Sequence, residues 1–111
     1  MKVIWSPRAK ESLKRTVRYV LLSFGEKPAE KLTKRVLQVE KTLTIYSDIG
    51  TIEPLLVNYP KSYRSIVINS INKLVFYVIN DTIIIVAFWD TRREPKALIK
   101  DLEDQEKFGE P

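Results

Sequence analysis

Four cations at predicted strand ends are the residues of this 111-residue chain whose types and spacing could do chemistry. Arg64 and Lys73 stand at the starts of two β-prone runs, and Arg92 and Arg93 follow a third run in the stretch WDTRREP. Because antiparallel strands bring such ends together, these groups could gather at one edge of a sheet. A cluster of guanidinium and ammonium groups could bind phosphates and stabilise negative charge that develops on a phosphodiester. The alternative is that these cations guard a sheet edge and solvate a loop.

Composition removes most other chemistries. The chain has no cysteine and no histidine, which excludes disulfides, cysteine nucleophiles, Ser–His pairs and the commonest zinc ligands. Glycine-rich phosphate loops, EF-hand spacing and HExxH are also missing. We therefore expect neither a metal nor a cofactor. Asp90 could be a catalytic carboxylate, but an aspartate beside arginines at a strand end also suits an ion pair or a turn.

The first half of the sequence predicts a short strand and two amphipathic helices. A β-prone run at 2–5 is stopped by Ser6-Pro7, where serine suits a helix N-cap and proline suits the first helical position. Gly25 ends this helix, and a second one begins at Pro28 and continues to about Tyr46. With so short a connection, the two helices should form an antiparallel hairpin.

The second half predicts an antiparallel meander. The segment at 47–62 indicates a loop, and β-branched and aromatic runs then predict strands at 63–68, 73–79 and 83–89, with a short C-terminal helix at 95–106. The fold class is therefore α+β, with a helical hairpin on one face of a small antiparallel sheet made of the N-terminal strand and the three-strand meander. We expect a single domain at 1–104 and an acidic tail at 105–111.

Both faces of the predicted sheet need cover. In the strand at 73–79, both alternating sets of side chains are apolar, with Leu74, Phe76 and Val78 opposite Val75, Tyr77 and Ile79. One helical hairpin can shield only one face. The other must be covered by the C-terminal segment, by a partner chain, or by both, since sizeable exposed apolar patches usually mark interaction sites.

Charge is spread unevenly. Residues 1–50 carry 11 basic and 5 acidic side chains, whereas residues 94–111 carry 3 basic and 6 acidic ones, and the net charge is +5. A basic body suits a polyanion or an acidic protein as its partner. No apolar run approaches the ~18 residues that a membrane span needs, so we expect a cytoplasmic protein without a membrane partner.

Taken in order, these pieces resemble the RelE/ParE superfamily of toxins from type II toxin–antitoxin systems. The resemblance runs from about residue 2 to about residue 102, and it is carried by Tyr63-Arg64-Ser65, by the segment at 72–77 and by Asp90 to Pro95. It implies a toxin that halts growth unless an antitoxin from the same operon neutralises it. RelE-like members cleave mRNA on the ribosome, and ParE-like members poison DNA gyrase.

The resemblance also implies site residues. Arg64, Lys73 and Arg93 match the cationic positions of the RelE nuclease pattern, but a second lysine of that pattern falls on Ile66 and its C-terminal tyrosine falls near Ile99. The chain has no tyrosine after Tyr77 and no histidine, so a general acid or base for RNA cleavage is missing. The resemblance therefore favours ParE-like inhibition of DNA gyrase. The alternatives are a metal-independent, ribosome-dependent mRNA endoribonuclease and a degenerate toxin that only binds its antitoxin.

A toxin of this kind would form a hetero-oligomer with its antitoxin. An extended or helical antitoxin segment would lie across the exposed sheet face and the helical hairpin, where the basic first helix suits an acidic partner. The acidic tail would screen the arginines if it folded over them. The binding candidates are Arg15, Arg18, Tyr77, Arg92 and Arg93.

Overall fold

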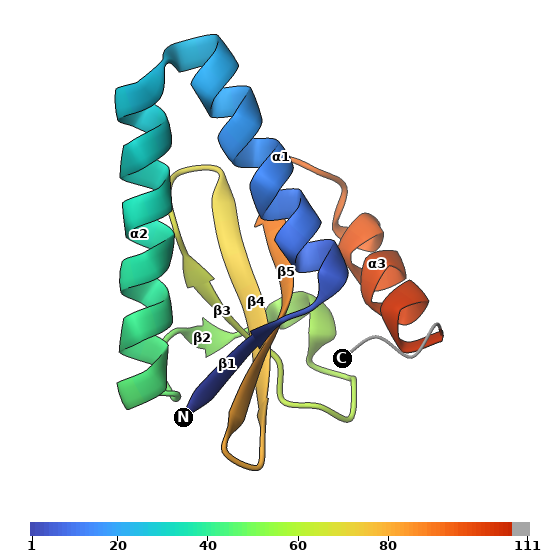
Figure 1. Ribbon diagram of the computed structural model, residues 1–111. Coiled ribbons are helices and arrows are strands. Elements are labelled where there is room, and N and C mark those ends of the chain that lie inside the picture. Colours follow the sequence, from blue (N-terminus) through green and yellow to red (C-terminus); the bar gives the residue numbers. More distant parts are fainter. Residues whose placement is uncertain (108–111) are drawn as a thin grey trace.

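The computed structural model describes residues 1–107. Along the chain the elements are β1 (Lys2–Trp5), α1 (Pro7–Phe24), α2 (Glu26–Ile45), β2 (Thr51–Ile52), a 3₁₀ turn η1 (Pro54–Leu56), β3 (Arg64–Val67), β4 (Asn72–Ile79), β5 (Thr82–Asp90) and α3 (Pro95–Lys107). Figure 1 shows α1 and α2 joined at one end of the molecule and α3 on the other side of the sheet. The predicted α+β fold is confirmed in its order of strand, helical hairpin, meander and C-terminal helix.

Local signals set the start and end of α1. The Ser6 hydroxyl accepts a hydrogen bond from the Ala9 amide at 3.2 Å, and Pro7 occupies the first helical position, where no amide hydrogen is needed. At the other end Gly25 has a φ of +99°, which side chains with a Cβ rarely adopt, and its amide donates to the Leu21 carbonyl. This glycine lets the chain reverse directly into α2.

The second helix begins two residues earlier than predicted. It starts at Glu26 and not at Pro28, so the proline lies inside the first turn. A proline fits there because the first amides of a helix have no carbonyl partner within the helix. The proline therefore marked the first turn correctly but not the first residue.

The sheet has five strands in the order β1-β5-β4-β3-β2. The antiparallel meander β3-β4-β5 is confirmed, but β1 pairs with β5 in parallel, with Val3 opposite Ile83 and Trp5 opposite Ile85. The sheet is thus mixed and not wholly antiparallel. The sheet also contains a strand that was not predicted, β2, which lies in the segment predicted as a loop. Its two residues pair with Arg64 and Ser65 of β3, and Pro54 follows shortly after the strand. Pairing with β3 decides its structure, and local composition gives no sign of it.

One hydrophobic core lies between the helical hairpin and the sheet. It joins buried side chains of α2 to one face of the central strands, and α1 adds Ala9 and the partly buried Leu13, Val17 and Val20. Its fully or nearly fully buried members are Val36, Val39, Leu43, Leu74, Phe76, Ile83, Ile85 and Phe88. The apolar spacing of both helices is explained by this single layer.

A second core fills the opposite face of the sheet. Leu98 and Leu102 of α3 and Leu56 of η1 are buried against the alternate side chains of β4 and β5, such as Val75 and Trp89. The C-terminal helix and the segment around η1 therefore provide the cover that the sequence required. The sheet face that was expected to be open to an antitoxin is not exposed, which corrects that expectation.

The acidic end of the chain is part of α3 as far as the structure describes it. Gln105 is buried and donates to the Val86 carbonyl at 2.9 Å, so the predicted tail boundary after 104 falls inside the helix. Arg8 pairs with Asp101 at 3.0 Å and with Asp104 at 3.7 Å. These acidic groups bind α3 to α1, and residues 108–111 of the predicted tail lie outside the described residues. Within residues 1–107, no helix combines the length and apolarity required to span a membrane.

Candidate functional site

Arg64 lies on the face of the sheet that the helical hairpin covers. Its guanidinium donates to the carbonyl oxygens of Asp48 at 2.8 Å and Gly50 at 2.9 Å, and its Nε donates to Ile49 at 3.4 Å. These bonds fix the loop that connects α2 to β2. The arginine therefore holds the chain in place at the point where the sequence predicted a phosphate ligand.

Lys73 lies on the other face. Arg64 is opposite Phe76 in the β3–β4 register, so these two side chains point to the same face of the sheet. Lys73 is three residues before Phe76 on β4, and because side chains alternate along a strand, Lys73 points to the opposite face. The Lys73 ammonium forms an ion pair with Glu53, whose carboxylate is buried and whose Oε2 has no hydrogen-bond partner among the described residues. Glu53 was not among the predicted site residues, because a lone glutamate before a proline in a loop gives no sign that it will be buried.

The two arginines after β5 are also engaged. Arg92 binds the Asp90 carboxylate through Nε at 3.0 Å and Nη2 at 2.7 Å, and its amide donates to the same carboxylate at 2.9 Å. The hydrogen bonds from Arg92 hold the pKa of Asp90 at about 2, well below its usual value, and they raise the pKa of Arg92. Arg93 lies over the ring of Trp89, with its guanidinium carbon 4.3 Å from the ring centroid.

The predicted cations therefore form no single site. Trp89 is opposite Lys73 in the β4–β5 register, and Arg93 lies over the Trp89 ring, so Lys73 and Arg93 are on the same side of the sheet. Arg64 is on the opposite side. Tyr77, a predicted binding residue, is buried in the second core, where the Lys61 ammonium lies 4.5 Å from its ring centroid. Within residues 1–107, no group of three or more acidic side chains is placed to hold a metal ion.

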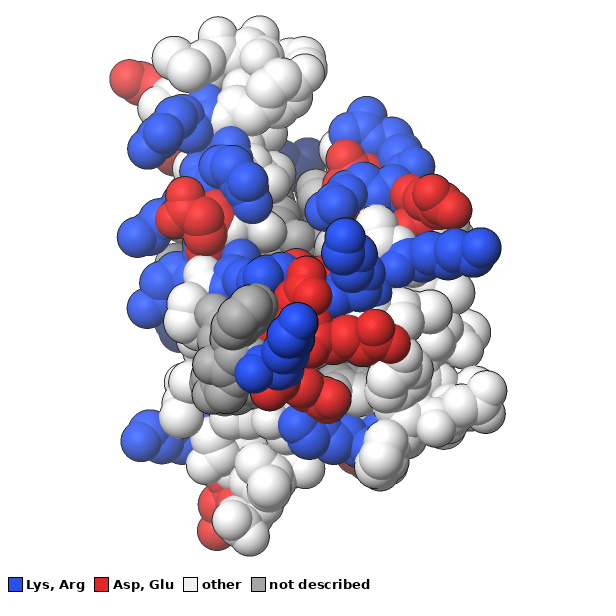
Figure 2. All heavy atoms as spheres, turned by 90° about the vertical axis from the view of Figure 1, so that its right-hand side faces the viewer, with Lys and Arg blue, Asp and Glu red and all other residues white. Residues whose placement is uncertain are grey.

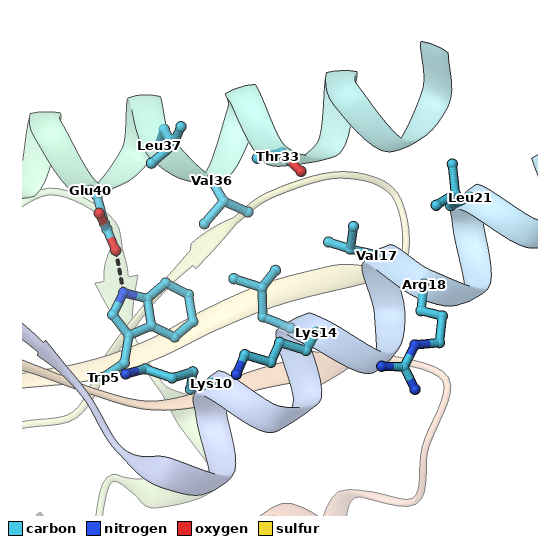
Figure 3. Close-up of a pocket in the computed structure, with 11 residues that line it drawn as sticks. Trp5, Lys10, Lys14, Val17, Arg18, Leu21, Thr33, Val36, Leu37 and Glu40 are labelled. Atoms are coloured by element: carbon cyan, nitrogen blue, oxygen red, sulfur yellow. Dashed lines mark hydrogen bonds between the residues drawn. The ribbon is translucent and has the colours of Figure 1, made fainter. Parts of the chain in front are cut away.

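A groove lies on the surface between α1 and α2. It has a volume of about 610 Å³, and its wall from α2 includes Leu37. Figure 3 shows Trp5 at one end of the groove, with its indole nitrogen donating to the Glu40 carboxylate, and Leu21 at the other. The lining residues are Trp5, Lys10, Leu13, Lys14, Val17, Arg18, Leu21, Thr33, Val36, Leu37 and Glu40.

The groove combines an apolar floor with a basic wall. Lys10, Lys14 and Arg18 recur every four residues along α1, so they lie on one side of that helix. Figure 2 shows basic side chains running along the hairpin edge and a largely uncharged tip above them. Leu21 and Leu37 are 43% and 50% exposed, which leaves apolar surface open at the groove. Such a surface can bind an amphipathic segment that carries acidic side chains.

Comparison with known proteins gives a family and a fold. The model of a family described as the ParE toxin of the type II toxin–antitoxin system parDE matches residues 3–95. Solved structures described as a chromosomal ParDE system from P. aeruginosa and a YoeB dimer from Staphylococcus aureus share the fold, with TM-scores of 0.65 and 0.58.

Their sequence identities to this chain are 19% and 24%. The first alignment covers 81% of this chain and 95% of the other, and the second covers 80% and 94%. At these identities the likeness shows the fold. No curated protein matches the chain.

Proposed function

The chain belongs to the ParE toxin family of type II toxin–antitoxin systems, and from that membership we propose that it acts in the ParE manner, by inhibiting DNA gyrase. We also propose that an antitoxin neutralises it by binding in the α1–α2 groove. A ribosome-dependent nuclease and a toxin without activity are the alternatives that an experiment must exclude.

The separation of the predicted cations supports a ParE-like toxin over a RelE-like nuclease. Phosphodiester cleavage needs cations that converge on one phosphate and a group that moves a proton. Here Arg64 is on the hairpin side of the sheet and is bound to loop carbonyls, whereas Lys73 is on the α3 side and is bound to Glu53. The two cations cannot bind the same phosphate across a packed sheet.

The groove suits an antitoxin because the sheet faces are already occupied. With α3 on one face and the hairpin on the other, the outer groove of the hairpin is an apolar surface that a partner can still reach. A helix with apolar side chains at i, i+3, i+4 and i+7 could place them on the groove floor, and acidic side chains on its edge would face Lys10, Lys14 and Arg18. Glu40 is the one acidic residue that lines the groove, against three cations, and its carboxylate accepts a hydrogen bond from the Trp5 indole.

Induction of the toxin without its antitoxin distinguishes the targets. We expect growth arrest with DNA breaks that depend on gyrase, measured by recovery of gyrase–DNA adducts, and we expect mRNA on ribosomes to stay intact. Cuts spaced by codons in the mRNA would instead establish the nuclease. Unaffected growth at a confirmed expression level would establish a degenerate toxin.

A pair of matched substitutions tests the groove. Leu37→Glu places a charge on the groove wall and should weaken antitoxin binding by about 30-fold or more, as expected of a central interface residue. Leu22→Glu is the control, because Leu22 is 79% exposed on the same hairpin and does not line the groove. Affinity is measured with the purified antitoxin encoded beside the toxin. Equal affinities for the two variants would place the antitoxin elsewhere.

A further inference from the structure

A second groove lies where the hairpin extends beyond the end of the sheet. It has a volume of about 720 Å³ and is formed by α1, α2, the β3–β4 turn, the last residue of β5 and Arg92. Its residues are Arg15, Thr16, Tyr19, Val20, Phe24, Pro28, Lys31, Leu32, Arg35, Ile68, Asn69, Ser70, Ile71, Asn72, Asp90 and Arg92. None of them lines the α1–α2 groove. The two grooves are therefore separate surfaces on the hairpin.

Cations from three parts of the chain line this second groove. Arg15 comes from α1, Lys31 and Arg35 come from α2, and Arg92 follows β5, while the one acidic lining residue, Asp90, is already paired with Arg92. Arg35 is held in place because it donates to the carbonyls of Ile68 at 3.2 Å and Val67 at 3.1 Å. The groove thus presents an excess of positive charge that its own carboxylate does not neutralise.

Two aromatic rings stand open at the same groove. Tyr19 and Phe24 are 61% and 64% exposed, and their centroids are 6.1 Å apart at an interplanar angle of 77°. Neither ring belongs to one of the two cores. Exposed aromatic faces beside cations that track a groove are the combination that binds single-stranded nucleic acid, because bases stack on the rings and phosphates pair with the cations.

We propose that this second groove binds single-stranded nucleic acid, with the phosphates on Arg15, Lys31 and Arg35 and a base on Tyr19 or Phe24. An acidic amphipathic helix is the competing occupant, because Val20, Leu32 and Ile68 also line this groove. The two exposed aromatic rings favour a base over such a helix. This inference does not depend on the proposed gyrase target. Because the two grooves share no lining residue, a partner in the α1–α2 groove would leave the second groove open.

Fluorescence anisotropy with a labelled 12-nucleotide single strand, as DNA and as RNA, tests the proposal. We expect saturable binding that weakens as salt rises from 50 to 200 mM. Removing two phosphate contacts with the double variant Arg15→Ala and Lys31→Ala should weaken binding at least tenfold and flatten the slope of log K against log salt by about 1.4. Tyr19→Leu should weaken binding about tenfold and leave that slope unchanged, because it removes stacking and no charge.

The matched control removes the same charge from the other groove. The double variant Lys10→Ala and Lys14→Ala also lowers the net charge by two, but its residues line the α1–α2 groove, so it should bind like the parent chain. Equal losses in the two double variants would show that binding follows net charge, and that result would overturn the site. So would the absence of saturable binding, or displacement of the single strand by an acidic amphipathic peptide whose own binding requires Tyr19. A preference for DNA or for RNA would identify the source of the strand.

Discussion

Lys73 forms an ion pair with the buried Glu53 carboxylate, and this contact gives the lysine a structural role. Glu53 is fully buried, and the Lys73 side chain that pairs with it is mostly buried. Lys73→Met should therefore lower the free energy of unfolding by about 3 kcal/mol, because the remaining glutamate would be buried without a partner. Adding Glu53→Gln to this variant should restore most of that loss, as measured by urea denaturation. Equal stability of the single variant and the parent chain would contradict a structural role for the pair.

Asp90 makes the stability of the chain depend on pH in the acid range. Its pKa in the folded chain is about 2, against 3.8 for an unperturbed aspartate, because Arg92 binds the ionised carboxylate. The stabilisation is therefore present above pH 3.8 and is lost as the pH falls toward 2. At neutral pH we expect Asp90→Asn to be less stable by under about 1 kcal/mol, since the pair is partly exposed. Thermal melts at pH 6, 4 and 2 should show the two proteins converging; a constant difference would contradict the pairing.

The sequence was enough to identify these side chains but not to place them. The types and positions of Arg64, Lys73 and Arg93 are visible in the chain, yet their faces depend on the register between β3 and β4. A change of one residue in that register would reverse every side chain of β3. The observed register places Arg64 and Lys73 on opposite faces of the sheet. The partner of Lys73, Glu53, comes from a loop twenty residues away in the sequence. Two interpretations of Asp90 were open, a catalytic carboxylate and an ion-paired turn residue. Its pairing with Arg92 matches the second.

At the scale of elements, the loop between α2 and β2 needs a glycine for two reasons. Gly50 has a φ of +85°, and a Cβ there would meet the Ser65 carbonyl oxygen at 2.4 Å and Cγ1 of Ile66 at 2.7 Å. Gly25 has a similar φ of +99° but has no heavy atom within 4 Å of an added Cβ. A comparison of the two glycines therefore separates the cost of a positive φ from the cost of the collision between an added Cβ and β3.

We expect Gly25→Ala to cost about 1 kcal/mol, which is the usual penalty of a positive φ. Gly50→Ala should cost at least about 2 kcal/mol more, because its Cβ also collides with the backbone of β3 and disturbs the carbonyls that Arg64 binds. Chemical denaturation of the two variants measures the difference. Equal losses would mean that the loop moves away from β3 without penalty.

Element types followed from local pattern, whereas their partners did not. The helices and the meander follow from apolar spacing and from Ser6, Pro7 and Gly25, which act within a few residues. The parallel pairing of β1 with β5 joins residues about eighty positions apart, and β2 exists only through its pairing with β3. No local signal specifies such contacts. The requirement for cover on the second face was visible, and the C-terminal segment was one of its predicted covers, but the sequence did not decide between that segment and a partner chain.

At the scale of the molecule, one sheet supports two cores and the hairpin carries two grooves. Because α3 and the hairpin occupy both faces of β4 and β5, the surfaces open to a partner are the outer sides of the helices and the edges of the sheet. The basic hairpin and the acidic α3, whose carboxylates are bound by Arg8 and Lys61, divide the charge between the two sides. A proposed antitoxin groove and a proposed nucleic-acid groove can therefore coexist on one hairpin.

The shared central strands should make the two cores unfold together. Leu43 of α2 and Leu98 of α3 are both fully buried, one in each core, and the cores have β4 and β5 in common. Leu43→Ala and Leu98→Ala should each lower the free energy of unfolding by about 3 kcal/mol. Both should retain a single urea transition with the m-value of the parent chain, because loss of either core exposes the same strands. If Leu98→Ala instead gave a second, early transition, α3 would be a separately unfolding cover, and the second face of the sheet would then be open to a partner after all.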